Sequence, residues 1–196
     1  MPEGVGQALA DSLDEVAQEV RRCVACGLHA GRTHAVPGEG PAHARLMVVG
    51  EGPGQQEDEA GRPFVGRAGQ LLTDMLRAIH LEREEVFIAN VVKCRPPDNR
   101  TPTSAEAEAC APFLARQIAL VNPEVILVLG RTAAEALMGP GVRITAVRGV
   151  WTTLGTRALM PSYHPAYLLR DPRKKKEAWE DLQRVAERLG IPVQRG

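Results

Sequence analysis

Short apolar runs along the chain alternate with longer segments in which apolar residues recur every three or four positions. The runs Leu46–Val49, Val86–Val92 and Val125–Leu129 have the length and the Val and Ile content of buried strands. The segments with three- or four-residue spacing predict helices that bury one face. Their apolar positions are Leu9, Leu13, Val16 and Val20 near the N-terminus, Leu71, Leu72, Met75, Leu76 and Ile79 after the first strand, and Trp179, Leu182, Val185 and Leu189 near the C-terminus.

Two further helices and a pair of strands complete the pattern. One helix is predicted from Ser104 to Val121, with acidic residues in its first turn, and another over residues 131–138. Residues 142–159 predict two strands around a turn at Gly155. Strands that alternate with helices predict a single α/β domain over residues 1–196, a three-layer α/β/α sandwich around a mostly parallel sheet of four or five strands.

The loops that leave the carboxyl ends of the predicted strands hold most of the unusual residues. In open parallel sheets, ligands bind at this edge. The loops concerned are 50–66, 93–103, 130–132 and 161–170.

Composition places the chain among ordinary globular proteins, with 44% hydrophobic and 24% charged residues and a formal net charge of zero. No apolar run approaches the roughly 20 residues that span a bilayer. Residues 1–20 carry five acidic and no basic residues, unlike a signal peptide, so a cytoplasmic protein is expected, nucleoid-associated in a prokaryote. Lys174–Lys176 stand where the last helix should begin; either that helix begins later, near Glu177, or these charges contact phosphate.

The chain has four cysteines, Cys23 and Cys26 in a C-x2-C turn and Cys94 and Cys110 far downstream. Four thiolates make a closed shell for zinc or for an iron–sulfur cluster. Spacing alone leaves these two alternatives open, beside a third in which the cysteines are unrelated buried residues.

The first strand runs into Gly50-Glu51-Gly52-Pro53-Gly54, where glycines allow a backbone to approach a ligand closely. The spacing does not match a dinucleotide fingerprint, and no helix is expected to start after Pro53. A tight strand-to-loop turn without a ligand is the alternative.

Three other residues are candidates for contact with a base. Phe64, among turn-forming residues, is either a stacking platform or a core residue. Asn90 interrupts an apolar strand, so its amide bonds either backbone or a ligand. His164, in a proline-bounded loop, is either structural or part of the site.

Together these pieces resemble a family 4 uracil-DNA glycosylase. The resemblance extends from about Cys23 to Arg170 and rests on several motifs in the right order. They are C-x2-C, VVGEGPGQQED, GRPFVGRAGQLL, NVVKCRPPDNR, the later Cys110, and SYHPAYLLR.

The resemblance implies a [4Fe–4S] cluster on the four cysteines, which would join residues 23–26 to residues 94–110. It also implies a uracil pocket lined by Glu51, Gly52, Pro53, Phe64, Asn90 and His164. Contacts to DNA, single- or double-stranded, are expected from Lys93, Arg95, Arg100 and Arg170.

The implied reaction flips uracil out of DNA and hydrolyses its N-glycosidic bond, leaving an abasic site. Phe64 would stack on the base, Asn90 would read its edge, and His164 would donate to the leaving oxygen. The better-known members of the superfamily position water with an aspartate where this chain has Gly52. That role therefore moves to Glu51, ahead of Glu57 or Asp58. A monomer is expected, and a non-catalytic iron–sulfur or zinc DNA-binding module is the alternative.

Overall fold

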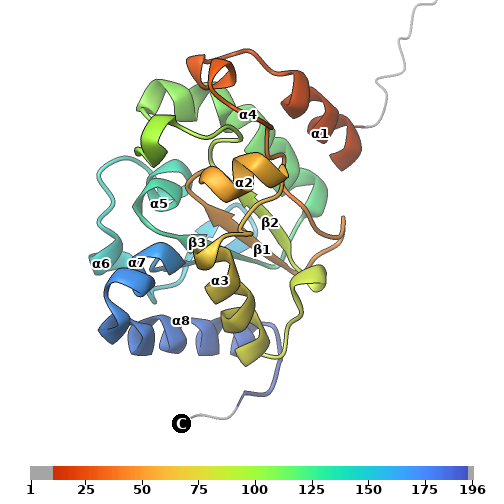
Figure 1. Ribbon diagram of the computed structural model, residues 1–196. Helices are drawn as coiled ribbons and strands as arrows, with labels where there is room; N and C mark the ends of the chain where they lie inside the picture. The colour runs from red at the N-terminus through yellow and green to blue at the C-terminus, as the bar shows by residue number, and fades with distance from the viewer. Residues whose placement is uncertain (1–10, 194–196) are drawn as a thin grey trace, which may run out of the picture.

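The computed structural model describes residues 11–193, so Leu9 of the predicted first helix lies outside the described residues. Helices cover both faces of a central sheet (Figure 1). Met47 and Val49 of the first strand belong to one core, and Leu46 and Val48 belong to the other. The strand is therefore buried on both sides, and the three-layer α/β/α sandwich predicted from the sequence is confirmed.

The sheet has five strands in the order β2-β1-β3-β5-β4. The strands β1, β2, β3 and β5 are parallel, and β4 pairs antiparallel to β5 at one edge. The opposite edge is β2. The strands are β1 (Leu46–Gly50), β2 (Phe87–Asn90), β3 (Val125–Leu129), β4 (Thr152–Leu154) and β5 (Arg157–Ser162).

One face of the sheet is covered by helices that include α1 and α4, and the other by helices that include α3 and α8 (Figure 1). The α-helices are α1 (Leu13–Arg22), α2 (Gln55–Ala60), α3 (Arg67–Ala78), α4 (Ser104–Val121), α5 (Arg131–Met138), α6 (Ile144–Val147), α7 (Pro165–Arg170) and α8 (Lys175–Arg188). Short 3₁₀ turns are η1 (Gly27–Ala30), η2 (Arg83–Glu85), η3 (Pro97–Asn99) and η4 (Pro172–Lys174).

Several predicted elements are confirmed at their predicted ends. The helix α4 starts after Thr103, whose hydroxyl accepts from the Glu106 N–H while the Glu106 carboxylate accepts from the Thr103 N–H. This reciprocal capping explains why the acidic first turn marked the start of the helix. The predicted third strand and the helix over residues 131–138 also lie where the sequence placed them.

Four local predictions are wrong. The helix α2 begins directly after Gly54, although no helix was expected there, and residues 165–170 form α7 within a predicted loop. Residues 144–147 form the helical turn α6 rather than a strand. The helix α8 starts at Lys175, not near Glu177, and Lys174 at its N-cap pairs with Glu177 across one turn.

The parallel strands bring their carboxyl ends to one edge of the sheet. The segments that follow β1, β2, β3 and β5 therefore lie together, and they carry Glu51, the end of β2 at Asn90, Thr132 and His164. Within residues 11–193, none of the helices is both long enough and apolar enough to cross a membrane.

Candidate functional site

The site is organised around Gly50, the last residue of β1. A Cβ placed on Gly50 would lie 2.5 Å from Cζ of Phe64 and 2.6 Å from Oδ1 of Asn90. Both side chains thus pack directly over the Gly50 backbone, which only glycine allows. Gly52 is restricted in the same way, since its Cβ would lie 2.7 Å from Cγ2 of Val92. The glycines of this loop are therefore needed for close packing at the site.

Asn90 carries an unused acceptor into this site. The residue is 2% exposed, and its Oδ1 is a buried atom that has no hydrogen-bond partner among the described residues. A buried polar atom without a partner costs free energy, commonly about 1–3 kcal/mol. Native proteins keep such atoms at places where a ligand or water completes the bond. The Asn90 side-chain oxygen accepts no hydrogen bond from the described backbone, so the backbone-bonded alternative does not hold for this atom.

Phe64 is held in an unusual backbone conformation. Its φ is +50°, in the left-handed region that residues other than glycine seldom adopt. The guanidinium of Arg83 donates to the carbonyl oxygens of Pro63 and Phe64, and Gly69 of α3 lets the helix approach the Phe64 carbonyl. The Phe64 ring stacks on the His164 ring, with centroids 5.5 Å apart and planes at 28°. Strain of this kind persists where surrounding contacts enforce it, and it is frequent at binding sites.

Two of the three acidic candidates are engaged in holding loops. Glu57 accepts from the N–H groups of Gly54, Val65 and Gly66, so it ties the loop after β1 to the Phe64 segment. Asp58 is buried and accepts from the N–H groups of Thr33 and His34. Both carboxylates therefore have a structural role in holding these loops.

Glu51 is the acidic residue that remains. It is partly exposed, and Oε2 of its carboxylate accepts from the hydroxyl of Thr132 at the start of α5. The backbone carbonyl of Glu51 accepts from the Val92 N–H, which anchors the residue beside the end of β2. One carboxylate oxygen is thus fixed by Thr132, and the other accepts no hydrogen bond from the described residues that would prevent contact with water.

His164 is placed by the start of α7. Its Nδ1 accepts from the Ala166 N–H at 3.1 Å, so it acts as the N-cap of the helix. Burial, helped by the positive charge of Arg170, lowers the pKa of His164 to about 4. Because Nδ1 is an acceptor and the ring is neutral at pH 7, the proton resides on Nε2, which becomes a hydrogen-bond donor.

The lowered pKa of His164 predicts a pH-dependent stability. An unfolded histidine binds a proton near pH 6.5, whereas the folded residue does so only near pH 4. The unfolded state therefore holds more protons between these values, and the free energy of unfolding falls as the pH drops from 6.5 to 4, by at most about 1.4 kcal/mol per pH unit. We expect His164→Leu to remove this contribution in melting curves recorded across that range. The exposed His43, replaced by leucine, serves as the control. An unchanged pH profile in His164→Leu would contradict the burial argument.

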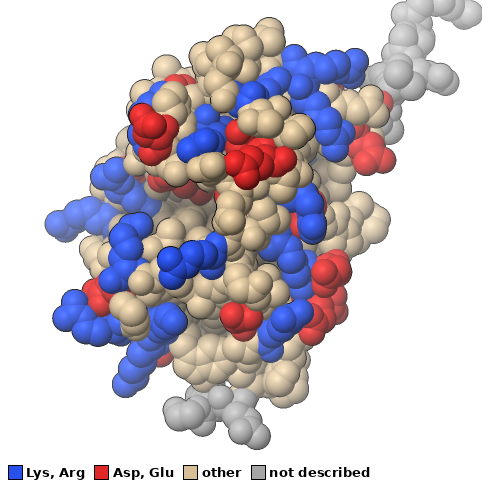
Figure 2. Space-filling view, viewed as in Figure 1, with Lys and Arg blue, Asp and Glu red and all other residues tan. Residues whose placement is uncertain are grey.

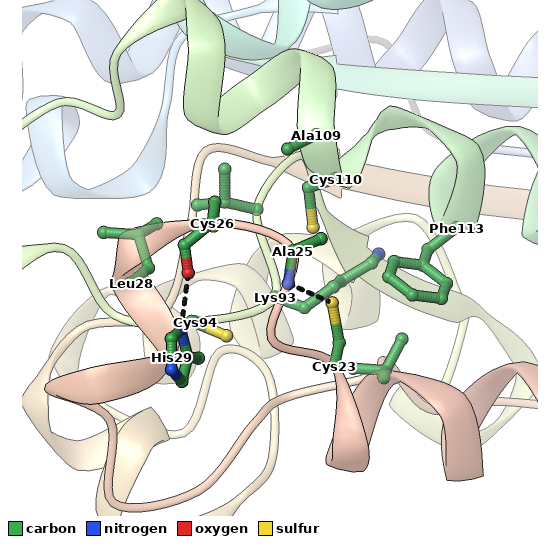
Figure 3. Close-up of a pocket in the computed structure, with 12 residues that line it drawn as sticks. Cys23, Ala25, Cys26, Leu28, His29, Lys93, Cys94, Ala109, Cys110 and Phe113 are labelled. Carbon is green, nitrogen blue, oxygen red and sulfur yellow. Dashed lines mark hydrogen bonds between the residues drawn. The ribbon is translucent and has the colours of Figure 1, made fainter.

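The four cysteines line one small pocket between α1, the segment after β2, and α4 (Figure 3). The sulfurs of Cys23, Cys94 and Cys110 point into the space between these segments. None of the four forms a disulfide, and Cys94 and Cys110 are buried. Burial raises the pKa of the Cys110 thiol to about 11, and it also raises the pKa of Cys94. The third sequence alternative, four unrelated cysteines, does not describe this arrangement.

Hydrogen-bond donors surround the cysteine sulfurs. The guanidinium of Arg32 donates to Sγ of Cys94 at 3.1 Å, and the Ala25 N–H donates to Sγ of Cys23 at 3.4 Å. Among the described residues, no group of three or more His, Cys, Asp or Glu side chains is placed to hold a single metal ion. A zinc shell needs sulfurs about 2.3 Å from one ion, whereas a cluster spreads its irons over a larger space. The four thiol side chains around one pocket suit an iron–sulfur cluster, and their chemistry alone suits zinc as well.

The predicted phosphate contacts divide into two groups. Lys93 is 1% exposed, and its ammonium donates to the Asn90 carbonyl and to Gln117, so the prediction that it contacts DNA is wrong. Arg95 bonds Asn99, and Arg100 forms a bidentate pair with Glu106. Arg170 is exposed beside His164.

Figure 2 shows Lys and Arg side chains spread over the lower left of the face, near α6, α7 and the start of α8, with acidic side chains over α2 and along the right edge. Exposed basic residues of these elements and of their flanks are Arg143, Arg170, Arg173, Lys175 and Lys176. The formal net charge of zero thus conceals a basic region next to the candidate site.

Some positioning residues were missed from the sequence. Thr132 lies in the predicted site loop 130–132, but nothing in the pattern linked it to Glu51. Arg83 acts on the Phe64 backbone from outside the motif, and Gly69 acts on it from a position of the motif that was not singled out. Arg32 lies in a segment interpreted only as loop. The position of a polar residue next to a strand end was the available signal for Thr132; the other three depend on tertiary contacts.

Comparison with known proteins gives concordant matches. The model of the uracil DNA glycosylase superfamily matches residues 37–183. A type-4 uracil-DNA glycosylase of Thermotoga maritima is 52% identical over 179 residues, which cover 88% of this chain and 92% of that protein. Type-4 uracil-DNA glycosylases of Sulfurisphaera tokodaii and Saccharolobus solfataricus are 47% and 46% identical, over 90% and 91% of this chain and 84% and 87% of theirs.

Proposed function

The chain belongs to the type-4 family of the uracil-DNA glycosylase superfamily, and from that premise we propose that it is a DNA repair enzyme that excises uracil from DNA. It hydrolyses the N-glycosidic bond of the flipped nucleotide and leaves an abasic site. The observation that carries the proposal is the buried Oδ1 of Asn90, an acceptor without a partner, beside a fixed phenyl ring and a neutral histidine.

Recognition follows from the donor and acceptor pattern of the base. The Asn90 amide accepts from N3–H of uracil and donates to O4. Cytosine reverses this pattern, so it would leave both groups unpaired in a buried site, which is a strong basis for rejection. Phe64 stacks on the base, and Gly52 and Pro53 line the pocket beside it. The strained backbone of Phe64 and its contacts with Arg83 support a rigid stacking surface.

Bond cleavage leaves positive charge on the sugar and negative charge on the departing uracil. The Nε2–H of His164 donates to O2 of uracil and stabilises that charge, an effect commonly worth about 3–4 kcal/mol. Glu51 orients the attacking water or stabilises the sugar cation with its unbonded carboxylate oxygen. The bond from Thr132 supports this role because it fixes the carboxylate.

We propose that the four cysteines hold a [4Fe–4S] cluster that braces the fold. When bound, the cluster supplies covalent links among α1, the segment after β2, and α4 through its thiolate ligands. The convergence of Cys23, Cys26, Cys94 and Cys110 on one pocket supports this assignment. Cys94 is four residues from Asn90, so the brace would also steady the end of β2.

Replacing Cys94 with serine is expected to lower iron and sulfide content and the melting temperature. Loss of a ligand from a metal site that supports the fold removes binding free energy that stabilises the native state. The measurements are iron and sulfide analysis, visible absorbance and thermal unfolding, with Arg95→Ser next to it as a control for a partly exposed substitution in the same loop. Full iron content in Cys94→Ser would refute the ligand assignment.

DNA lies, in this proposal, across the face that carries Arg170, with Arg95 and Arg100 on the loop after β2. Positive side chains on this face supply the salt-dependent contacts with phosphate. The enzyme approaches DNA as a monomer and works in a prokaryotic cytoplasm, at the nucleoid. The basic region of Figure 2 supports the placement of the DNA.

The test is to incubate the purified holoprotein with a uracil-containing oligonucleotide and to measure free uracil and alkali-labile abasic sites. A thymine-containing oligonucleotide of the same sequence is the control. Release of uracil without release of thymine is the expected result. DNA binding without release, from a folded protein with full iron content, would instead favour the non-catalytic DNA-binding module.

A further inference from the structure

Lys93 is a fully buried lysine for which the proposed reaction has no use. Its ammonium donates to the main-chain carbonyl of Asn90 at 2.8 Å and to Oε1 of Gln117 at 2.7 Å. Gln117, itself buried, donates from Nε2 to the carbonyl of Pro37 at 2.7 Å. None of the ion pairs among residues 11–193 includes Lys93. The two hydrogen bonds therefore offset part of the cost of burying the ammonium.

The hydrogen bond from Lys93 to the Asn90 carbonyl lies where no neighbouring strand can supply a donor. The strand β2 is an edge strand, and its outer side is paired only at Ile88, which exchanges both backbone bonds with Glu39. Outward-facing groups recur every second residue along a strand, so the next outward carbonyl is that of Asn90. The Lys93 ammonium takes the place of the missing strand and satisfies this carbonyl.

The same residue is placed between the two parts of the site. Its ammonium donates to the backbone carbonyl of Asn90, the proposed base-reading residue. Its main chain directly precedes Cys94 and is hydrogen-bonded to Cys110. Val36 donates its N–H to the Lys93 carbonyl at 2.7 Å, and Gln117 lies within α4. A shift of the cysteine segment would therefore reach the end of β2 through the ammonium group as well as along the chain.

We propose that Lys93 is a positioning residue that sets the orientation of the Asn90 amide by holding the end of β2, and that it links this orientation to the cysteine pocket. The inference rests on the proposed uracil excision. Lys93 contacts neither base nor phosphate in this role. It acts on catalysis only through Asn90.

The test compares Lys93→Met, which keeps the length of the side chain without its charge or donors, with Arg188→Met at an exposed position in the last turn of α8. A misplaced catalytic group costs up to about a hundredfold in rate, so we expect kcat for uracil release to fall about tenfold to a hundredfold in Lys93→Met. The inhibition constant of free uracil should rise with it. Affinity for an abasic oligonucleotide and iron content should stay within about twofold, and Arg188→Met should resemble the unsubstituted protein.

A double-mutant cycle makes the assignment specific to Asn90. If Lys93 acts through Asn90, adding Lys93→Met to Asn90→Ala lowers activity no further. If the two residues act independently, the fold losses of the single variants multiply. If Lys93→Met does not fold, Gln117→Met removes the second partner of the ammonium and should lower kcat in the same direction at constant iron content.

Three results would overturn the inference: unchanged kcat in the folded variant, weakened DNA affinity with unchanged kcat, or multiplicative effects in the cycle. An unsubstituted protein that releases no uracil would instead refute the proposed function itself.

Discussion

Asn90→Ala is expected to lower kcat/KM for uracil release about a thousandfold while leaving the protein as stable as before. A site built to hydrogen-bond its substrate loses several orders of magnitude when those bonds cannot form. Stability should hold because Oδ1 of Asn90 has no partner among the described residues, so its removal breaks no internal bond of that atom. The measurements are single-turnover uracil release and chemical unfolding of the same preparations.

The control for Asn90→Ala is Gln70→Ala, which removes an exposed amide from α3. It should leave uracil release within about twofold of the unsubstituted protein, because surface substitutions away from special contacts change little. Normal uracil release by Asn90→Ala would remove Asn90 from the base pocket. A large loss of stability would show that its side chain supports the fold.

Glu51→Gln should lower kcat by about a hundredfold or more and leave DNA affinity nearly unchanged. The substitution preserves the shape of the side chain and an oxygen that accepts from Thr132, but it removes the charge that orients water or stabilises the sugar cation. Positioned acid or base groups contribute about a hundredfold to ten-thousandfold to such steps. Rapid-quench kinetics with saturating enzyme isolate the chemical step from binding.

Glu59→Gln on α2 provides a matched control, since Glu59 is exposed and its side chain accepts a hydrogen bond from Gln55, one turn earlier in the same helix. We expect its kinetics to equal those of the unsubstituted protein. If Glu51→Gln also retained its rate within about threefold, no acidic side chain of this loop would serve the reaction. The carboxylate oxygens of Glu57 and Asp58 already accept hydrogen bonds from backbone N–H groups.

The sequence predicted the parallel strands from their uninterrupted apolar runs and most of the longer helices from their apolar periods. It failed at α2, whose residues 55–60 are nearly all polar and give no period. That helix is specified by its ends: Glu57 bonds the Gly54 N–H, and Gly61 adopts a left-handed conformation that closes the last turn. End signals of this kind are visible in the sequence but are too common to predict a helix alone.

The site was predicted in part. The order of the motifs predicted that Glu51, Phe64, Asn90 and His164 form one site. The structure places them at the carboxyl edge of the sheet. Lys93 was misjudged because charge in a loop is usually solvated. Its burial depends on a carbonyl left open by an edge strand and on an amide from α4, and neither partner can be seen from local sequence.

The two edges of the sheet bear on how the protein behaves at high concentration. The β4 edge is three residues long, and the β2 edge is four residues long and is covered at Ile88 by Glu39 and at Asn90 by Lys93. Exposed strand edges invite pairing with another chain, and short or capped edges discourage it. The Lys93 ammonium thus also covers part of this edge, and a substitution there would leave the Asn90 carbonyl as an edge group without its partner.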